Sequence, residues 1–576
     1  MDWPVERTTT QAADQPDGVL SDLNFGEVLP FVTKPLAKDY LARYVGPLLA
    51  SQFAGLPRTH PLSRQLNPMA FVAGRPYMDL SAYITLPGIA WHLGSLESAD
   101  RTKGAAVVAL SQTGRLRPLP LSVFARLSLY TAYARLSLQS ARWLLRLQTP
   151  VNLLQAYRDR TEELRVLVRQ PVDQVPSAAL LRDLDERFYN TGDPTTNALR
   201  HLGIAFFLYT ALQEFLSDRV PTSLVHDLGQ GIPNNFTTEV SLDLWQLVEE
   251  AGPLAAVFAK APADELFGIL NTTEEGRRWW ARFEEVLARH GHRGEVELDI
   301  TTPRWREAPR FLLQTITNYL RHPEDHPSPA ETLKIAIGRR EAAAAAIRAT
   351  LPRPRRLLFD WLYSRYVVWM PFREAGKYTW LLWLERCRKV YRELGRRLVA
   401  AGHLRAIDDV FWLHLGELAA WAESGRIGWS AALLKEREQQ WVAWSTLRPP
   451  PLLIGSHGVE EARSFSSPAS LGAVLRGTPA SSGQAEGIAR VMTDPRNADL
   501  RQGEILVTRY TDPAWTPLFF TAAALVTEVG GVLSHGAVIA REIGLPAIVG
   551  VAGVTSRIRS GQRVRVNATE GTVEVL

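Results

Sequence analysis

The stretch Thr527–Val551, TEVGGVLSHGAVIAREIGLPAIVGV, decides the fold of the C-terminal part of the chain. A β-rich run reaches the glycine pair Gly530 and Gly531, and a helical run follows from about Ser534. Glycine permits backbone conformations that are closed to other residues, and serine is a good N-cap. Gly544 is typical of the position after a helix. The stretch therefore predicts a strand, a glycine loop, a short helix and a second strand.

His535 falls in the first turn of this predicted helix. Free backbone N–H groups and the positive end of the helix dipole favour anions there. Imidazole is largely neutral near pH 7 and can form a covalent intermediate. The position suits a histidine that carries a phosphoryl group. For a histidine taken alone, a capping or packing role is the alternative interpretation.

Short β-rich runs and short helices surround this stretch. The runs are GIARVM, EILVTRY, AALVTE and PAIVGV, and the chain ends in RVRVNATEGTVEVL, which is typical of a hairpin with its turn at 569–571. These patterns predict a small α/β domain over residues 477–576.

From about Pro35 to Leu447 the pattern is helical, with apolar residues every three or four positions. The alanine-rich segment Glu341–Leu351 is its strongest helix former. Prolines, serines and glycines then accumulate. We therefore predict a multidomain α plus α/β chain, with a large mostly helical domain over 1–450, a linker over 451–476 and the small domain over 477–576.

Composition sets limits on partners and compartment. The 576 residues carry a net charge of only +5, so we expect no nucleic-acid partner. No apolar run reaches the roughly 20 residues of a membrane span, so we expect no membrane partner either. The start of the chain lacks the pattern of a signal peptide, and the single cysteine, Cys387, cannot form an internal disulfide. These features predict a cytoplasmic protein.

Together with Gly477–Val491 and Ile505–Phe519, the glycine-histidine stretch resembles the swivelling domain of the phosphoenolpyruvate-utilising enzymes. In that family the histidine after the glycine pair is phosphorylated, which implies that His535 is the catalytic nucleophile. Plant dikinases have a regulatory threonine where this chain has Leu533, so that control is not expected. Residues expected to support the phosphohistidine loop are Thr527, Gly530, Gly531, Ser534, Gly536 and Arg541.

The helical part resembles the central, acceptor-binding domain of the rifampin phosphotransferase branch of this family. The matching segments are Ser21–Leu36, Gly231–Leu247, Gly291–Glu307 and Ile407–Leu413, in that order. The resemblance implies an acceptor-binding domain for a small-molecule hydroxyl compound. It does not identify the acceptor.

The segment Gly291–Glu307 of the helical part contains many ionisable groups. A base is needed to take the acceptor proton, and cations are needed to stabilise the incoming phosphoryl group. An ion-pair cluster that holds the fold is an equally good interpretation. His290 and His292 do not have convincing metal-ligand spacing, so we predict no metal site. The candidate acceptor residues are His292, Arg293, Glu297, Asp299 and Arg304.

No segment resembles the ATP-grasp domain of this family, and no phosphate-binding loop of the Walker type is present. The resemblance therefore implies that ATP and Mg²⁺ bind to a separate ATP-grasp protein, with no cofactor on this chain. We expect the acceptor-binding and phosphohistidine-carrying component of a split, dikinase-type phosphotransferase. The alternative is a non-catalytic binding or regulatory relative.

Overall fold

The computed structural model describes residues 2–8, 18–22, 29–87, 101–146, 148–189, 197–321, 328–458, 474–492, 500–511, 515–532 and 534–576. The chain divides into two compact units. Unit 1 comprises Met1–Ile204, Leu298–Thr301 and Gly376–Phe465, and unit 2 comprises Ala205–Glu297, Thr302–Ala375 and Ser466–Leu576. This division follows packing contacts, so the C-terminal residues are grouped with the helices that they touch. The domain boundaries near 450 and 477 stay a prediction.

Unit 1 is mostly helical, as the apolar periodicity predicted. Two of its helices, α12 (Ala198–Leu216) and α21 (Phe372–Ala400), continue into unit 2. The others, including a π-helical turn η1 and a 3₁₀ helix η6, are α3 (Pro35–Tyr40), η1 (Leu41–Val45), α4 (Gly46–Ala54), α5 (Pro61–Gln65), α6 (Leu80–Thr85), α8 (Arg101–Gln112), α9 (Val123–Leu145), α10 (Gln148–Arg169), α11 (Ser177–Tyr189), η6 (Ile407–Trp412), α22 (Leu415–Ser424) and α23 (Ala431–Thr446).

Unit 1 also contains an antiparallel sheet of six strands in the order β1-β3-β4-β2-β5-β6. The β3–β4 hairpin lies in the stretch where the sequence indicated helix. Every residue of both strands is buried, so the period-two alternation of a half-exposed strand is missing. Residues 459–473 of the predicted linker lie outside the described residues. The strands are β1 (Val5–Arg7), β2 (Val19–Ser21), β3 (Met69–Val72), β4 (Arg75–Asp79), β5 (Leu452–Ile454) and β6 (His457–Gly458).

The N-terminal part of unit 2 is helical. Its apolar core gathers side chains from successive helices, among them Leu244, Phe258, Phe283 and Ile316. The alanine-rich segment lies in α19, as predicted. The helices, with one 3₁₀ turn η4, are α13 (Thr222–Asp227), α14 (Phe236–Glu250), η4 (Gly252–Leu254), α15 (Ala255–Lys260), α16 (Leu266–Leu270), α17 (Glu274–His290), α18 (Arg310–Arg321), α19 (Pro329–Thr350) and α20 (Arg353–Trp369).

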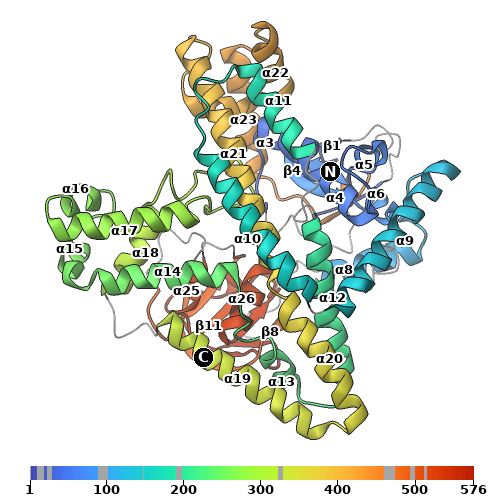
Figure 1. Ribbon diagram of the computed structural model, residues 1–576, viewed down its shortest axis with the longest axis vertical. Helices are drawn as coiled ribbons and strands as arrows, with labels where there is room; N and C mark the ends of the chain where they lie inside the picture. The colour runs from blue at the N-terminus through green and yellow to red at the C-terminus, as the bar shows by residue number, and fades with distance from the viewer. Residues whose placement is uncertain are drawn as a thin grey trace. The chain divides into compact units, whose positions relative to one another are not determined.

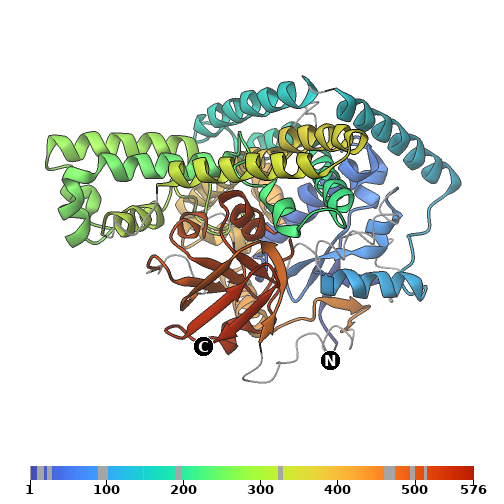
Figure 2. The same cartoon turned by 90° about the horizontal axis from the view of Figure 1, so that it is seen from below.

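The C-terminal residues form a mixed sheet, drawn in orange to red beside the C-terminus in Figure 2. Its eight strands lie in the order β7-β14-β13-β9-β10-β11-β12-β8. Strands β9 to β12 are parallel, and the remaining pairs are antiparallel. The predicted α/β character is confirmed. The elements are β7 (Leu475–Arg476), β8 (Thr478–Ser481), β9 (Gln484–Met492), β10 (Ile505–Thr508), α25 (Thr516–Phe519), β11 (Ala524–Thr527), α26 (His535–Ile543), β12 (Ala547–Val549), α27 (Val554–Arg557), β13 (Arg563–Asn567) and β14 (Thr572–Val575).

Both faces of this sheet are covered. Leu506 and Leu525 pack with Ile539 of α26, whereas Val507 and Val526 belong to a second apolar cluster. Alternate residues of the parallel strands therefore face opposite layers. This two-sided burial fixes α26 against one face of the sheet and so positions its first turn.

The single cysteine lies in α21 of unit 1. Its side chain is fully buried, and burial raises the pKa of the Cys387 thiol well above its usual range. In the described part of the chain, no helix is both long and apolar enough to cross a membrane.

Candidate active site at the start of helix α26

Helix α26 begins at His535, and Ser534 is its N-cap. Ser534 has extended backbone angles, and its Oγ accepts a hydrogen bond from the N–H of Ala537 at 3.3 Å. At the other end, Gly544 adopts a left-handed conformation with φ of 73°. Both ends of the predicted helix are therefore confirmed. His535 occupies the first helical position, where intrahelical bonding leaves backbone N–H groups available.

The loop before α26 requires glycine at Gly530. Its φ is 125°, and a Cβ there would lie 3.1 Å from Oγ of Ser534. Thr527, at the end of β11, is buried beneath this loop, and its hydroxyl makes no hydrogen bond with any described residue. Leu533 lies outside the described residues. The tight loop thus places the capping serine directly above the end of a parallel strand.

His535 is half-buried, and its Nε2 lies 3.1 Å from Oγ1 of Thr516. Thr516 is buried at the start of α25, which connects β10 to β11. The hydroxyl therefore restrains the imidazole through one ring nitrogen. Sequence reasoning did not single out Thr516, although it lies within the stretch Ile505–Phe519 that carried the resemblance.

The first turn of α26 also packs closely against the loop after β10. A Cβ on Gly536 would lie 2.2 Å from Oγ1 of Thr511 and 3.2 Å from Leu525. Any larger residue at position 536 forces the threonine or the helix to move. Gly536 therefore sets how near the histidine turn approaches the sheet.

Arg541 ties the helix to its surroundings. Its buried guanidinium donates from Nε to the carbonyl of Ala480 at 3.0 Å and from Nη2 to the carbonyl of Val532 at 2.9 Å. Its Cζ also lies 4.9 Å from the ring centroid of Tyr209 on α12. Arg541 thus fixes the loop before His535 and contacts the helical part of unit 2.

The far end of α26 packs on the helical part of unit 2, where α26 and β8 lie beside α13 and α19 (Figure 1). The carboxylate of Glu542 accepts a hydrogen bond from Asn235, and its backbone carbonyl accepts one from the N–H of Gly231 at 2.8 Å. His226 and Ser482 make a further contact of 2.7 Å. These contacts hold the C-terminal domain against the turn between α13 and α14.

Glu542 is a buried carboxyl within this contact. Burial raises the pKa of Glu542 from its ordinary value of 4.5 to about 7, and the charge of nearby Glu374 adds to the rise. Arg373, Arg541 and the hydrogen bond from Asn235 act in the opposite direction. The contact therefore contains a group that titrates near neutral pH.

Four of the five candidate acceptor residues, His292, Arg293, Glu297 and Arg304, are buried in unit 2. Nε of Arg293 lies 2.7 Å from Oε1 of Glu297, and Arg304 donates to the carbonyl of Glu297 at 2.7 Å. Trp305 packs beneath Arg293, with its ring centroid 5.7 Å from Cζ. This geometry favours the ion-pair interpretation of the segment.

The fifth candidate, Asp299, belongs to unit 1. Its carboxylate accepts two hydrogen bonds from Thr301, both at 2.8 Å, which closes a local turn. His290 lies 2.7 Å from Oδ2 of Asp243 and is therefore part of a pair. Among the described residues, no group of three or more histidine, cysteine or acidic side chains is placed to hold a metal ion.

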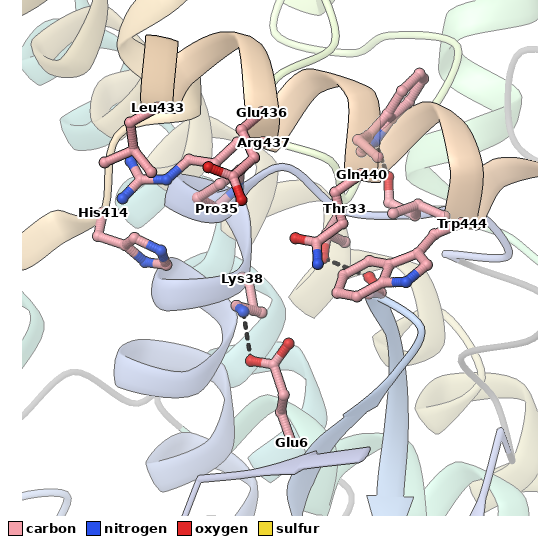
Figure 3. Close-up of a pocket in the computed structure, with 13 residues that line it drawn as sticks. Glu6, Thr33, Pro35, Lys38, His414, Leu433, Glu436, Arg437, Gln440 and Trp444 are labelled. Atoms are coloured by element: carbon pink, nitrogen blue, oxygen red, sulfur yellow. Dashed lines mark hydrogen bonds and ion pairs between the residues drawn. The ribbon is translucent and has the colours of Figure 1, made fainter. Parts of the chain in front are cut away.

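A separate cavity of about 230 Å³ lies in unit 1 between α3, α23 and the β3–β4 turn (Figure 3). Three of its charged side chains are in ion pairs: Lys38 pairs with Glu6, and Arg437 pairs with Glu417 at 2.8 Å. The indole of Trp441 donates to the carbonyl of Val32 at 2.7 Å. These partners lead us to interpret the cavity as a packing gap.

The glycine loop, the histidine at a helix start and the parallel strands beneath them lie together in the C-terminal part of the chain. The model of the PEP-utilising enzyme mobile domain matches residues 500–571, and the model of the rifampicin phosphotransferase fourth domain matches residues 198–374. The resemblance inferred from the sequence is therefore confirmed. Residues 500–571 are therefore similar to the mobile domain of the PEP-utilising enzymes, and residues 198–374 are similar to the fourth domain of rifampicin phosphotransferase.

Among individual proteins, the chain is similar to rifampicin phosphotransferase of Streptomyces sviceus, at 34% identity over 64% of this chain and 43% of that protein. It is 28% identical to rifampicin phosphotransferase of Bacillus subtilis over 74% of this chain and 49% of that protein. It is 33% identical to the prodigiosin synthesizing transferase PigC of Serratia marcescens over 64% of this chain and 42% of that protein. The chain thus spans less than half the length of these relatives.

Proposed function

We propose that this chain is the acceptor-binding and phosphohistidine-carrying component of an ATP-dependent, dikinase-type phosphotransferase. The observation that carries the proposal is the position of His535, half-buried at the start of α26 with Thr516 on one ring nitrogen. The match to the PEP-utilising enzyme mobile domain and the names of the relatives support it.

In the first half-reaction, a ring nitrogen of His535 attacks phosphorus of a nucleotide phosphate. A P–N bond forms as the P–O bond to the leaving phosphate breaks. The N–H groups in the first turn of α26 and the helix dipole stabilise the negative charge on the transferred group. The Thr516 hydroxyl holds the ring in the orientation that this attack requires.

In the second half-reaction, a hydroxyl oxygen of a small molecule attacks the phosphoryl group. The P–N bond breaks, the ring nitrogen recovers its electron pair, and the hydroxyl proton passes to a base. We assign acceptor binding to the helical part of the chain, with His292, Arg293, Glu297, Asp299 and Arg304 retained as candidate residues near it. The relatives include a rifampicin phosphotransferase and a prodigiosin synthesizing transferase, so they suggest no single acceptor.

ATP and Mg²⁺ bind, in this proposal, to a separate ATP-grasp protein. The mobile domain must then leave the contact around Glu542 and Asn235 to reach that nucleotide. Both transfer sites must exclude water, since a phosphohistidine is lost by hydrolysis. In this proposal the rotation takes place between the helical part and the C-terminal domain.

The test is phosphoryl uptake from labelled ATP with Mg²⁺ and an ATP-grasp protein encoded beside this chain. We expect acid-labile label on the wild type and none on His535→Ala. His403→Ala, at an exposed histidine of unit 1, is the matched control and should label normally. Equal labelling of wild type and His535→Ala contradicts the assignment of the nucleophile.

The split arrangement has its own test. Without the ATP-grasp protein, calorimetry should detect no micromolar ATP binding by this chain. Such binding contradicts the separate nucleotide site but leaves the role of His535 intact.

A further inference from the structure

Helix α9 of unit 1 exposes apolar side chains on the face where a surface helix normally carries polar ones. Its inner face packs on α4 through Leu129, with Ala125 and Ala132 beside it. The large apolar side chains on the outer face, with their exposed fractions, are Val123 (78%), Phe124 (85%), Leu127 (61%), Tyr130 (61%), Leu138 (57%) and Leu145 (68%). The helix is therefore apolar on two opposite faces, and the described residues of unit 1 cover only one of them.

The charged residues in the sequence around this helix are all basic. Residues 101–157 contain no acidic residue at all. Arg126, Arg135 and Arg142 of α9 are exposed and make no ion pair with any described residue. The basic residues of the region are Arg101, Lys103, Arg115, Arg117, Arg126, Arg135, Arg142 and Arg146. An occupant of the outer face must therefore be anionic as well as apolar.

The shape of the apolar stripe distinguishes between occupants. At about 100° per residue, the side chains from Phe124 to Tyr130 span an arc of about 120°, which is wider than the seam of a coiled coil. Arg135 and Arg142 lie along one border of this arc. A second copy of the chain would bring another α9 with three arginines and no acid, so like charges would meet. A flat anionic surface satisfies both the width and the charge.

We propose that α9 attaches this protein to an anionic lipid surface. The helix lies parallel to the surface, the outer apolar side chains enter the boundary between headgroups and acyl chains, and the arginines bind lipid phosphates. No spanning helix is needed. The proposal goes beyond phosphoryl transfer and replaces the sequence-based expectation that the chain has no membrane partner.

The test is co-sedimentation of the full chain with vesicles of phosphatidylcholine and phosphatidylglycerol at 3:1, compared with phosphatidylcholine alone. We expect at least tenfold stronger binding to the anionic vesicles at 50 mM NaCl and loss of binding at 500 mM. Arg135→Gln with Arg142→Gln should weaken binding about 25-fold, since each arginine near such a surface contributes roughly fivefold. Phe124→Ser with Leu127→Ser should also release the protein.

The matched control is Ile335→Ser with Leu357→Ser, which removes two exposed apolar side chains from α19 and α20. It should bind anionic vesicles like the wild type. If the serine pair in α9 prevents folding, the arginine pair tests the same surface with both apolar residues present.

Three results overturn the proposal. The first is a wild-type protein that does not sediment with anionic vesicles. The second is a set of α9 variants that sediment as well as the wild type does. The third is a dimer, measured by light scattering, that the α9 substitutions dissociate in the absence of any vesicle binding. That result assigns the surface to a second copy of the chain.

Discussion

The first turn of α26 and the segment 291–307 each carry a histidine close to a glycine, yet they differ in what surrounds the histidine. His535 is half-buried, at the start of a helix, with one neutral hydroxyl on its ring. His292 is fully buried in a segment where Arg293 is paired with Glu297 and Arg304 is bound to a backbone carbonyl. The first histidine is held at a helix start through one ring nitrogen, whereas the second lies in a segment held by ion pairs and hydrogen bonds among its own residues.

This difference shows that a cluster of ionisable residues indicates a catalytic site less strongly than one restrained, partly exposed side chain does. Buried charges need partners to offset the cost of desolvation, and those partners occupy the positions that a substrate would need. Substitutions in the two regions should therefore act on different measurements. Changes near 293 should alter stability, and changes near 535 should alter transfer.

The largest expected effect on stability is that of Arg293→Met. It removes the buried ion pair with the Glu297 carboxylate, which costs about 3–5 kcal/mol of unfolding free energy. Urea denaturation measures this loss. Arg293→Met with Glu297→Leu should recover most of it. If the Arg293→Met protein is as stable as the wild type but no longer transfers a phosphoryl group to the acceptor, the segment 291–307 is part of the acceptor site. The contrast with the region of His535 would then be wrong.

The second effect depends on pH and belongs to Glu542, which lies on the same helix as His535. Its pKa in the folded protein, about 7, lies above its ordinary 4.5, so the folded state binds a proton more tightly than the unfolded state. This stabilisation is complete below pH 4.5 and is lost as pH rises through 7, a change of about 3 kcal/mol.

Glu542→Gln should remove this part of the pH dependence and be the more stable protein at pH 8. The measurement is the difference between the melting profiles of variant and wild type from pH 5 to pH 8. Glu570→Gln, at an exposed turn, is the matched control and should follow the wild type. Parallel profiles for Glu542→Gln and wild type would show that Glu542 is not buried in solution.

A smaller loss is expected from Gly536→Ala. The added methyl group would overlap Oγ1 of Thr511, and overpacking of this kind costs about 1–3 kcal/mol. Thr511→Ala combined with Gly536→Ala should restore stability, because it removes the Oγ1 atom that the added methyl group would overlap. Thermal denaturation of the single and double variants measures both effects. An unchanged melting temperature for Gly536→Ala alone would show that the turn does not pack as closely as described.

The smallest effect is that of Ser534→Ala, which removes the N-cap of α26 and costs about 1 kcal/mol. Ser534→Asp should keep the cap, and hence the stability, but place a negative charge beside the phosphoryl group. Label uptake should then fall while the melting temperature is retained. If the Ser534→Asp protein takes up as much label as the wild type does, the phosphoryl group does not lie at the start of α26.

Much of the C-terminal domain could be predicted from the sequence because its signals are local. Alternating valines, the glycine pair, the capping Ser534 and the terminal Gly544 each act within a few residues. Thr516 could not be found in this way. It reaches His535 only because β10 and β11 are parallel neighbours, which brings residues 19 apart in sequence to 3.1 Å.

Two further differences have the same origin. The β3–β4 hairpin resembled a helical segment because both of its faces are buried, which removes the alternation that identifies strands. The side chain of Asn235 binds Glu542 in the C-terminal domain, a partner 307 residues away in sequence that no local pattern indicates. Burial and long-range partners are properties of the folded chain, and neither is encoded in residue spacing.

The burial of Cys387 has a practical consequence for measuring domain movement. Because the chain has one cysteine and its thiol is inaccessible with a raised pKa, thiol reagents should leave the native protein unlabelled. Cysteines introduced at exposed positions of the helical part and of the C-terminal domain will then be the sole sites for spectroscopic probes or a reversible cross-link. The unaltered protein serves as the unlabelled control, so the distance between the C-terminal domain and the helical part can be followed without background labelling.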